Sequence, residues 1–106
     1  MSSTLRRIRE LVAGGEFRIS DHGYDELAED GILVGEVIAA LADARVIEDY
    51  PSYPKGPCVL VLLTGDDGRA IHAVWGLPRG QAPPAVLVTA YKPDPEKWTD
   101  DFTRRQ

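Results

Sequence analysis

The sequence is poor in cysteine and has no long apolar run. Cys58 is the only cysteine, so no internal disulfide can form, which fits a reducing cytoplasm. A membrane-spanning helix needs about eighteen apolar residues in a row, and the chain has no such stretch. The first residues also lack the apolar stretch that follows the charges of a secretory signal. We therefore expect a soluble, cytoplasmic protein.

Positive charge is also scarce, and its distribution is uneven. The net charge is −5, and residues 21–50 contain nine acidic residues against a single base, Arg45. An acidic surface repels phosphate backbones, so a broad nucleic-acid-binding face is excluded and any RNA contact must use a local basic patch. The simplest interpretation of the acidic stretch is a solvated helix face that keeps the protein soluble.

Several sequence motifs that indicate a particular function are absent. The sequence has no phosphate-binding glycine loop, no paired cysteines and no zinc-binding HExxH motif. These absences leave isolated polar side chains, rather than a known motif, as the candidates for chemistry.

The first half of the sequence has helical periodicity. Apolar residues recur every three or four positions within 5–12 and 34–41, which predicts two amphipathic helices. Between them, Ser20 and Asp21 can cap another helix that Gly31 ends. Residues 17–19 are expected to form a short extended link.

The second half reads as strands separated by turns. Residues 58–63 form a continuous apolar run typical of a buried central strand, and the Gly-Asp-Asp-Gly turn at 65–68 leads into a return strand at 69–76. Residues 46–50 and 85–91 are the other expected strands. Because side chains alternate along a strand, His72 is predicted to lie on the opposite side of its strand from Trp75, and Leu87, Thr89 and Tyr91 are predicted to share one side of the last strand.

Helices followed by hairpins predict an α+β domain. We expect one domain, 1–106, with a helical part at 3–43, a sheet part at 45–92 and a C-terminal tail at 93–106. Two or three N-terminal helices should pack on one face of a roughly four-stranded antiparallel sheet. The other face should then remain partly open.

The two histidines are the main candidates for acid–base chemistry, because imidazole titrates near neutral pH and two such groups can serve as base and acid on a phosphodiester. His22 falls at the start of the second helix, where backbone N–H groups attract anions, although a capping role is the alternative. His72 lies within an apolar strand, which favours a buried, hydrogen-bonded histidine over a catalytic one.

Other reactive side chains are weaker candidates. Tyr91 ends the last strand and could donate a proton or orient a phosphate, although tyrosines are common at sheet edges. Cys58 has no base near it in sequence and lies in a strand predicted to be buried, which argues against a nucleophile. A metal ion held by His22, Asp25 and His72 is a further alternative, and it is disfavoured because His–Asp pairs often occur without metals.

Three segments, in this order and spacing, resemble the domain-of-unknown-function family 4258, over roughly residues 17–102: Ser20-Asp21-His22 with Gly31-Ile32 downstream, Ile71-His72-Ala73-Val74, and Thr89-Ala90-Tyr91-Lys92-Pro93-Asp94-Pro95-Glu96-Lys97-Trp98. The resemblance implies the compact fold of RelE-like and related toxin ribonucleases. It also implies a toxin of a toxin–antitoxin pair, whose partner is an antitoxin, often of the zinc-finger type that resembles the one of the MqsR/MqsA system. His22, His72 and Tyr91 stand where the characteristic polar residues of the family stand, and Trp98 matches as a structural residue.

The chain departs from the family pattern after the first histidine. There the family usually has an acid followed by an arginine, and often a second arginine before the glycine. The corresponding residues are Asp25, Glu26 and Asp30, so the acid is kept and both bases are replaced by acids. Any RNA phosphate contact made by those arginines in relatives would have to come from other cations here, namely Arg18, Arg69, Lys92, Arg104 or Arg105.

The leading hypothesis is an endoribonuclease that needs no metal and no cofactor, in which the 2′-hydroxyl of RNA attacks the adjacent phosphate. His22 serves as base or acid, with His72 or Tyr91 as the complementary group. The cations expected to bind phosphate are Arg18, Arg69 and Lys92. The rival hypothesis is a protein-binding module of the same fold without catalysis, and the third is a small metal-dependent hydrolase.

Overall fold

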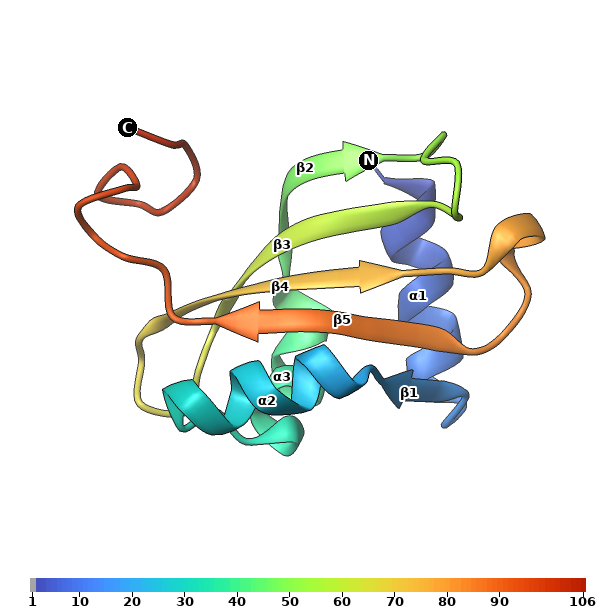
Figure 1. Cartoon of the computed structure of the whole chain (residues 1–106), viewed down its shortest axis with the longest axis horizontal. Helices are drawn as coiled ribbons and strands as arrows, with labels where there is room; N and C mark the ends of the chain where they lie inside the picture. Colours follow the sequence, from blue (N-terminus) through green and yellow to red (C-terminus); the bar gives the residue numbers. More distant parts are fainter. Residues whose placement is uncertain (1) are drawn as a thin grey trace.

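The computed structural model describes residues 2–106 and has an α+β fold, as predicted, with three α-helices and one five-stranded sheet (Figure 1). No helix in these residues has the length and apolar content needed to cross a bilayer. The elements in chain order are α1 (Ser3–Ala13), β1 (Phe17–Ile19), α2 (Asp21–Asp30), α3 (Val34–Ala40), a 3₁₀ turn (Leu41–Asp43), β2 (Arg45–Tyr50), β3 (Cys58–Thr64), β4 (Ala70–Gly76), a 3₁₀ turn (Arg79–Gln81) and β5 (Ala85–Tyr91).

The sheet has one strand more than expected. Its order is β1-β5-β4-β3-β2, and β2 to β5 are antiparallel neighbours as predicted. The additional strand is β1, which pairs in parallel with the start of β5, Phe17 opposite Ala85 and Ile19 opposite Leu87. Three residues are too few for an alternating pattern to identify a strand, so the sequence indicated only an extended link.

The helices cover one face of the sheet, called here the helix-covered face. Figure 1 shows α1 behind the strands, and the apolar side of this helix packs on β3, β4 and β5. Ser2 caps α1 by accepting a hydrogen bond from the backbone N–H of Leu5 at 3.1 Å. The core on this face is fully buried and consists of residues from the helices and from alternate strand positions, among them Ile8, Leu11, Val37, Val59, Val61, Ile71, Ala73, Trp75 and Leu87. Burial of these side chains is the main source of stability of the fold.

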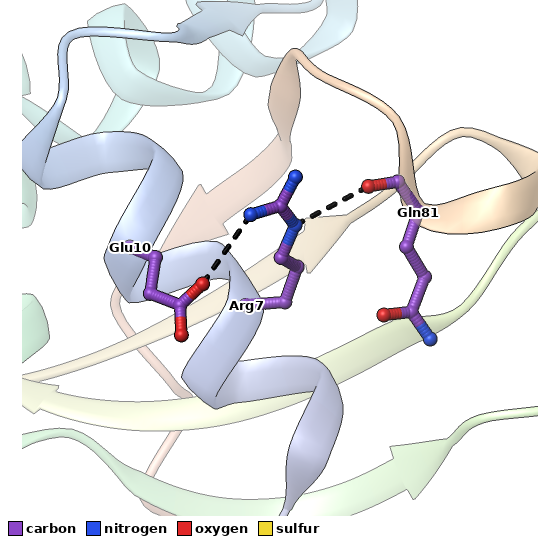
Figure 2. A network of polar contacts seen from close by, with 3 residues as sticks. All are labelled: Arg7, Glu10 and Gln81. Atoms are coloured by element: carbon purple, nitrogen blue, oxygen red, sulfur yellow. Dashed lines mark hydrogen bonds and ion pairs between the residues drawn. The ribbon is translucent and has the colours of Figure 1, made fainter.

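Arg7 fastens α1 to the connection between β4 and β5. Its Nε donates to the carbonyl oxygen of Gln81 at 3.3 Å, and its Nη1 lies 3.3 Å from a carboxylate oxygen of Glu10 (Figure 2). A long-range contact of this kind holds the loop 77–84 in place at the end of the sheet where β5 begins.

Helix α2 continues the path of β1 along the edge of β5 (Figure 1). Its N-cap, Ser20, accepts a hydrogen bond from the backbone N–H of Gly23 at 2.9 Å and donates from its hydroxyl to the carbonyl of Val88 at 2.8 Å. The backbone N–H of Ser20 also donates to the carbonyl of Leu87 at 3.0 Å. The cap predicted from the sequence is therefore confirmed, and it also binds the helix to β5.

A bulge at Val88 corrects the predicted faces of β5. Thr89 pairs with Val74 and Leu87 pairs with Trp75, which leaves Val88 as an extra residue. Leu87 therefore faces the helix-covered core, whereas Thr89 and Tyr91 face the opposite side. The prediction that all three share one side was wrong, because strict alternation fails where one strand gains a residue.

Gly23 is expected to tolerate no side chain. A Cβ at this position would lie 2.9 Å from the Leu87 carbonyl oxygen and 3.1 Å from a methyl carbon of Ile19. We predict that Gly23→Ala lowers the free energy of unfolding by about 1–3 kcal/mol, because α2 must move away from β5. Urea denaturation followed by circular dichroism measures this change.

Gly35→Ala is the matched control, since Gly35 is also helical and a Cβ there meets nothing within 4 Å. That substitution should stabilise the protein by up to about 1 kcal/mol through helix propensity. Equal effects of the two substitutions would contradict the close packing of α2 on β5.

Candidate functional site

The face of the sheet opposite the helices is divided into two regions. Strand pairing places Leu62, His72 and Tyr91 in one row across β3, β4 and β5. The C-terminal tail folds over this row. The other end of the same face, around Gly76 and Val86, is a hollow of about 660 Å³ that the tail does not cover. We call the first region the tail-covered site and the second the open groove.

His72 is the centre of the tail-covered site and is completely buried. Its Nε2 lies 2.8 Å from the carbonyl oxygen of Phe102, so Nε2 carries the proton and donates. Its Nδ1 is then an acceptor and lies 3.4 Å from the Tyr91 hydroxyl. The ring of Trp98 stands edge-on to the imidazole, with ring centroids 4.3 Å apart. Both ring nitrogens thus have partners, as the sequence suggested for a buried histidine.

The tail is closed on itself and attached to β2. Trp98 pairs with Arg105 in an isolated β-bridge, and the guanidinium of Arg105 also stacks over the indole at 5.0 Å. Arg105 then reaches β2 and forms an ion pair with Glu48 at 2.8 Å. The turn between them is held by Asp101, whose carboxylate accepts hydrogen bonds from the Thr99 and Thr103 hydroxyls, both at 2.7 Å.

Burial and charge set the protonation states at this site. Burial lowers the pKa of His72 below its ordinary value, so the imidazole is neutral at pH 7, and burial raises the pKa of Tyr91. The hydrogen bond from Arg105 lowers the pKa of Glu48, which is therefore ionised. Hydrogen bonds from Thr103 and Thr99 lower the pKa of Asp101 to about 2. The site combines a neutral imidazole, a phenol, a carboxylate and a guanidinium.

The environment of His22 differs from that of the buried His72. His22 is exposed on α2, and its Nε2 is 3.6 Å from a carboxylate oxygen of Glu26 one turn later. Asp25 is exposed on the same helix. Within residues 2–106 no three His, Cys, Asp or Glu side chains are grouped to hold a metal ion, so the site considered for His22, Asp25 and His72 does not form.

The two acids that replace the family's arginines have contacts of their own. Glu26 pairs with His22, and its charge contributes to the raised pKa of Tyr91. Asp30 accepts a hydrogen bond from the backbone N–H of Lys92 at 2.8 Å, which fixes the end of β5 to the end of α2.

The three cations predicted to bind phosphate are spread over the molecule. Arg18 is on β1 and lines the open groove. Arg69 is largely exposed in the turn between β3 and β4, where it lies 3.8 Å from Asp67. Lys92 directly follows the end of β5. No common phosphate site is formed by the three.

Glu48 is a site residue that the sequence did not reveal, and Arg105 was considered only as one of several cations that could contact RNA phosphate. A carboxylate in a short strand and an arginine in a tail carry no spacing signal that connects them to His72. A bulge in β2 between Val46 and Glu48 sets which side chains of this strand face the tail. Bulges cannot be located from alternation alone, so no signal in the sequence indicated Glu48. Cys58 lines the open groove, and burial raises the pKa of its thiol.

A comparison with known protein families matches residues 19–92 to the family described as a domain of unknown function (DUF4258). No curated protein and no solved structure matches the chain, so a RelE-like fold stays a prediction. The matched range contains Glu48, His72 and Tyr91 but ends before the tail that covers them. Because the match spans well over half of the sequence, the chain belongs to the DUF4258 family.

Proposed function

We propose that the protein is a toxin-type endoribonuclease that requires no metal, with its reacting groups in the tail-covered site. The observation that carries the proposal is the convergence of His72, Tyr91 and Glu48 on one face, with the guanidinium of Arg105 beside them. Attack by a ribose 2′-hydroxyl needs a base, an acid for the departing 5′-oxygen and positive charge near the phosphorane. These four side chains supply each of these functions.

The roles follow from the protonation states. The neutral imidazole of His72 is suited to accept the 2′-hydroxyl proton, and the phenol of Tyr91 is suited to protonate the leaving oxygen. Arg105 places positive charge near both of these groups. The products are a 2′,3′-cyclic phosphate and a 5′-hydroxyl end. His22, exposed on α2 beside Glu26, remains a candidate for binding the flanking RNA or for exchanging protons with solvent.

RNA can reach His72 only when the tail loop moves. The Phe102 carbonyl occupies Nε2, and the imidazole has no exposed surface. Opening of residues 99–104, while Trp98 and Arg105 remain in place, would expose this nitrogen, which can act as the base once its proton has moved to Nδ1. We propose that in a toxin–antitoxin pair this closed form is the resting state of the protein.

The experiment combines growth and RNA cleavage. Induced wild type should arrest a bacterial culture, and the purified protein should cleave messenger RNA, with or without ribosomes, to 2′,3′-cyclic phosphate ends. His72→Gln and Tyr91→Phe should each lower the cleavage rate by about 10²-fold or more, the usual contribution of an acid–base group. Arg6→Ala, at an exposed position of α1 on the opposite side of the sheet, is the control and should cleave like wild type.

A second function is favoured by a specific observation, the complete occupation of both ring nitrogens of His72. A histidine in this state serves packing, and the domain would then be a protein-binding module without catalysis. Absence of growth arrest and of RNA cleavage by wild type would overturn the ribonuclease proposal and leave this second function.

A further inference from the structure

The open groove has a preformed wall. The loop between β2 and β3 is fixed to the residues after β4 by three contacts: the Leu77 N–H donates to the Pro57 carbonyl at 2.9 Å, Arg79 Nε donates to the Pro54 carbonyl at 2.6 Å, and Gly56 lies so close that a Cβ would be 2.0 Å from the Leu77 carbonyl oxygen. The loop is therefore held in place without a ligand, so little ordering is needed when one binds.

The floor of the groove is apolar. Val74 on β4 and Val86 and Val88 on β5 form it, and Val88 is exposed because of the bulge. Tyr50 and Tyr53 stand at the β2 side and are about half exposed, 45% and 50%. Exposed aromatic and aliphatic side chains gathered in one hollow are typical of a binding surface.

Two cations border this floor. Arg18 belongs to the edge strand β1, and Lys55 lies in the loop between β2 and β3 that packs on the residues after β4. Within residues 2–106 neither side chain has an ion pair or hydrogen bond.

We propose that the open groove binds a short segment of a partner protein, apolar in its centre and acidic at both ends. Apolar side chains would cover the valine floor and contact Tyr50 and Tyr53, and the acidic ends would pair with Arg18 and Lys55. This inference goes beyond the ribonuclease proposal and does not rest on it, because none of the residues proposed to cleave RNA lines the open groove.

The same features disfavour an RNA strand in the groove. RNA carries a phosphate at every nucleotide, and the centre of the groove offers no cation to meet one. The floor also has no polar side chain to hydrogen-bond base edges. The acidic helix α2 begins three residues after Arg18 and would repel the backbone.

The test is a selection from a display library of random peptides on the full-length protein. The expected result is enrichment of peptides with an apolar centre and acidic flanks. Fluorescence anisotropy with a labelled selected peptide should then show about tenfold weaker binding to Arg18→Glu and to Lys55→Glu. Arg69→Glu, an equal charge change in a distant exposed turn, is the control and should bind like wild type.

A charge swap sharpens the result. Arg18→Glu should recover affinity for a variant peptide in which one acidic flank is replaced by lysine. Enrichment of basic peptides, or equal binding to all three variants, would overturn the proposal. Tighter binding of a labelled oligouridine than of any peptide, lost in Arg18→Glu, would also overturn it and identify the groove as a nucleic-acid site. RNA cleavage by wild type is scored separately with the His72 and Tyr91 variants.

Discussion

Replacing Trp98 with alanine is expected to release the C-terminal tail and to lower the free energy of unfolding by about 3 kcal/mol. Trp98 is 6% exposed, stands against the imidazole of His72 and carries the Arg105 guanidinium over its other surface. Its removal leaves a large cavity and dissolves the bridge on which the tail closes. Because the tail is a peripheral element, we expect part of the loss to appear as local opening.

Two measurements separate local from global effects. Urea denaturation gives the change in total stability, and amide hydrogen exchange reports the N–H of Thr99, Phe102 and Gln106, which donate within the tail. In the variant these amides should exchange much faster than those of β3 and β4. Unchanged exchange in the tail would contradict the central role of Trp98.

Phe102→Gly is the matched control within the same tail. Phe102 has a positive φ of 61°, which disfavours a bulky residue, and its contact with His72 uses the backbone carbonyl. Glycine keeps that carbonyl and adopts this φ without strain. We expect a change of less than about 1 kcal/mol, although an aromatic side chain is removed in both variants.

The Trp98 variant also bears on the ribonuclease proposal. Arg105 belongs to the proposed reacting groups and depends on Trp98 for its position, so Trp98→Ala should cleave RNA more slowly than wild type. Faster cleavage by this less stable variant would contradict a catalytic role of Arg105 and would indicate that the tail only covers His72.

The parts of the fold that follow a regular period could be predicted from the sequence. The apolar spacing of α1 and α3, the caps Ser20 and Gly31 and the apolar run of β3 each result from local rules, and the structure confirms them. Parity also placed His72 on the side of its strand opposite Trp75. It failed in β5, where one extra residue at Val88 reverses the sides.

The site was harder to predict because non-local contacts without a period form it. His72 and Tyr91 were candidates from the sequence, and strand pairing does bring them together. That the C-terminal tail covers these two residues was not predicted. Its contacts are a backbone carbonyl at Phe102 and a bridge between Trp98 and Arg105, and neither leaves a pattern in the residue types. His22 is exposed on α2, where it pairs with Glu26, and its part in the chemistry stays a prediction.

The second large effect is expected in the pH dependence of stability. Burial lowers the pKa of His72 in the folded protein, whereas the unfolded chain binds a proton with a pKa of about 6.5. Below that pH the unfolded state holds more protons than the folded state, so the free energy of unfolding falls as the pH falls. The slope approaches about 1.4 kcal/mol per pH unit, and it ends at the lowered pKa of the folded state.

Glu48 and Asp101 do not contribute to the change of stability between pH 7.5 and 5.5. Glu48 and Asp101 have lowered pKa values in the folded state, so each stabilises the protein above its unfolded value, 4.5 or 3.8, and loses that contribution only at lower pH. Urea denaturation at pH 7.5, 6.5 and 5.5 therefore isolates the histidines. His72→Gln should be less stable at pH 7.5 but should show a much smaller slope than wild type.

The only other histidine provides the control, since His22 is exposed on α2 and its ring is 65% accessible. His22→Gln should retain the wild-type slope. Loss of the slope in His22→Gln, or its persistence in His72→Gln, would contradict a neutral, buried His72. For the ribonuclease proposal the expected result has a further consequence. An imidazole that resists protonation while the tail is closed is still neutral when the loop opens, and transfer of its single proton from Nε2 to Nδ1 then gives the exposed Nε2 the lone pair that a base needs.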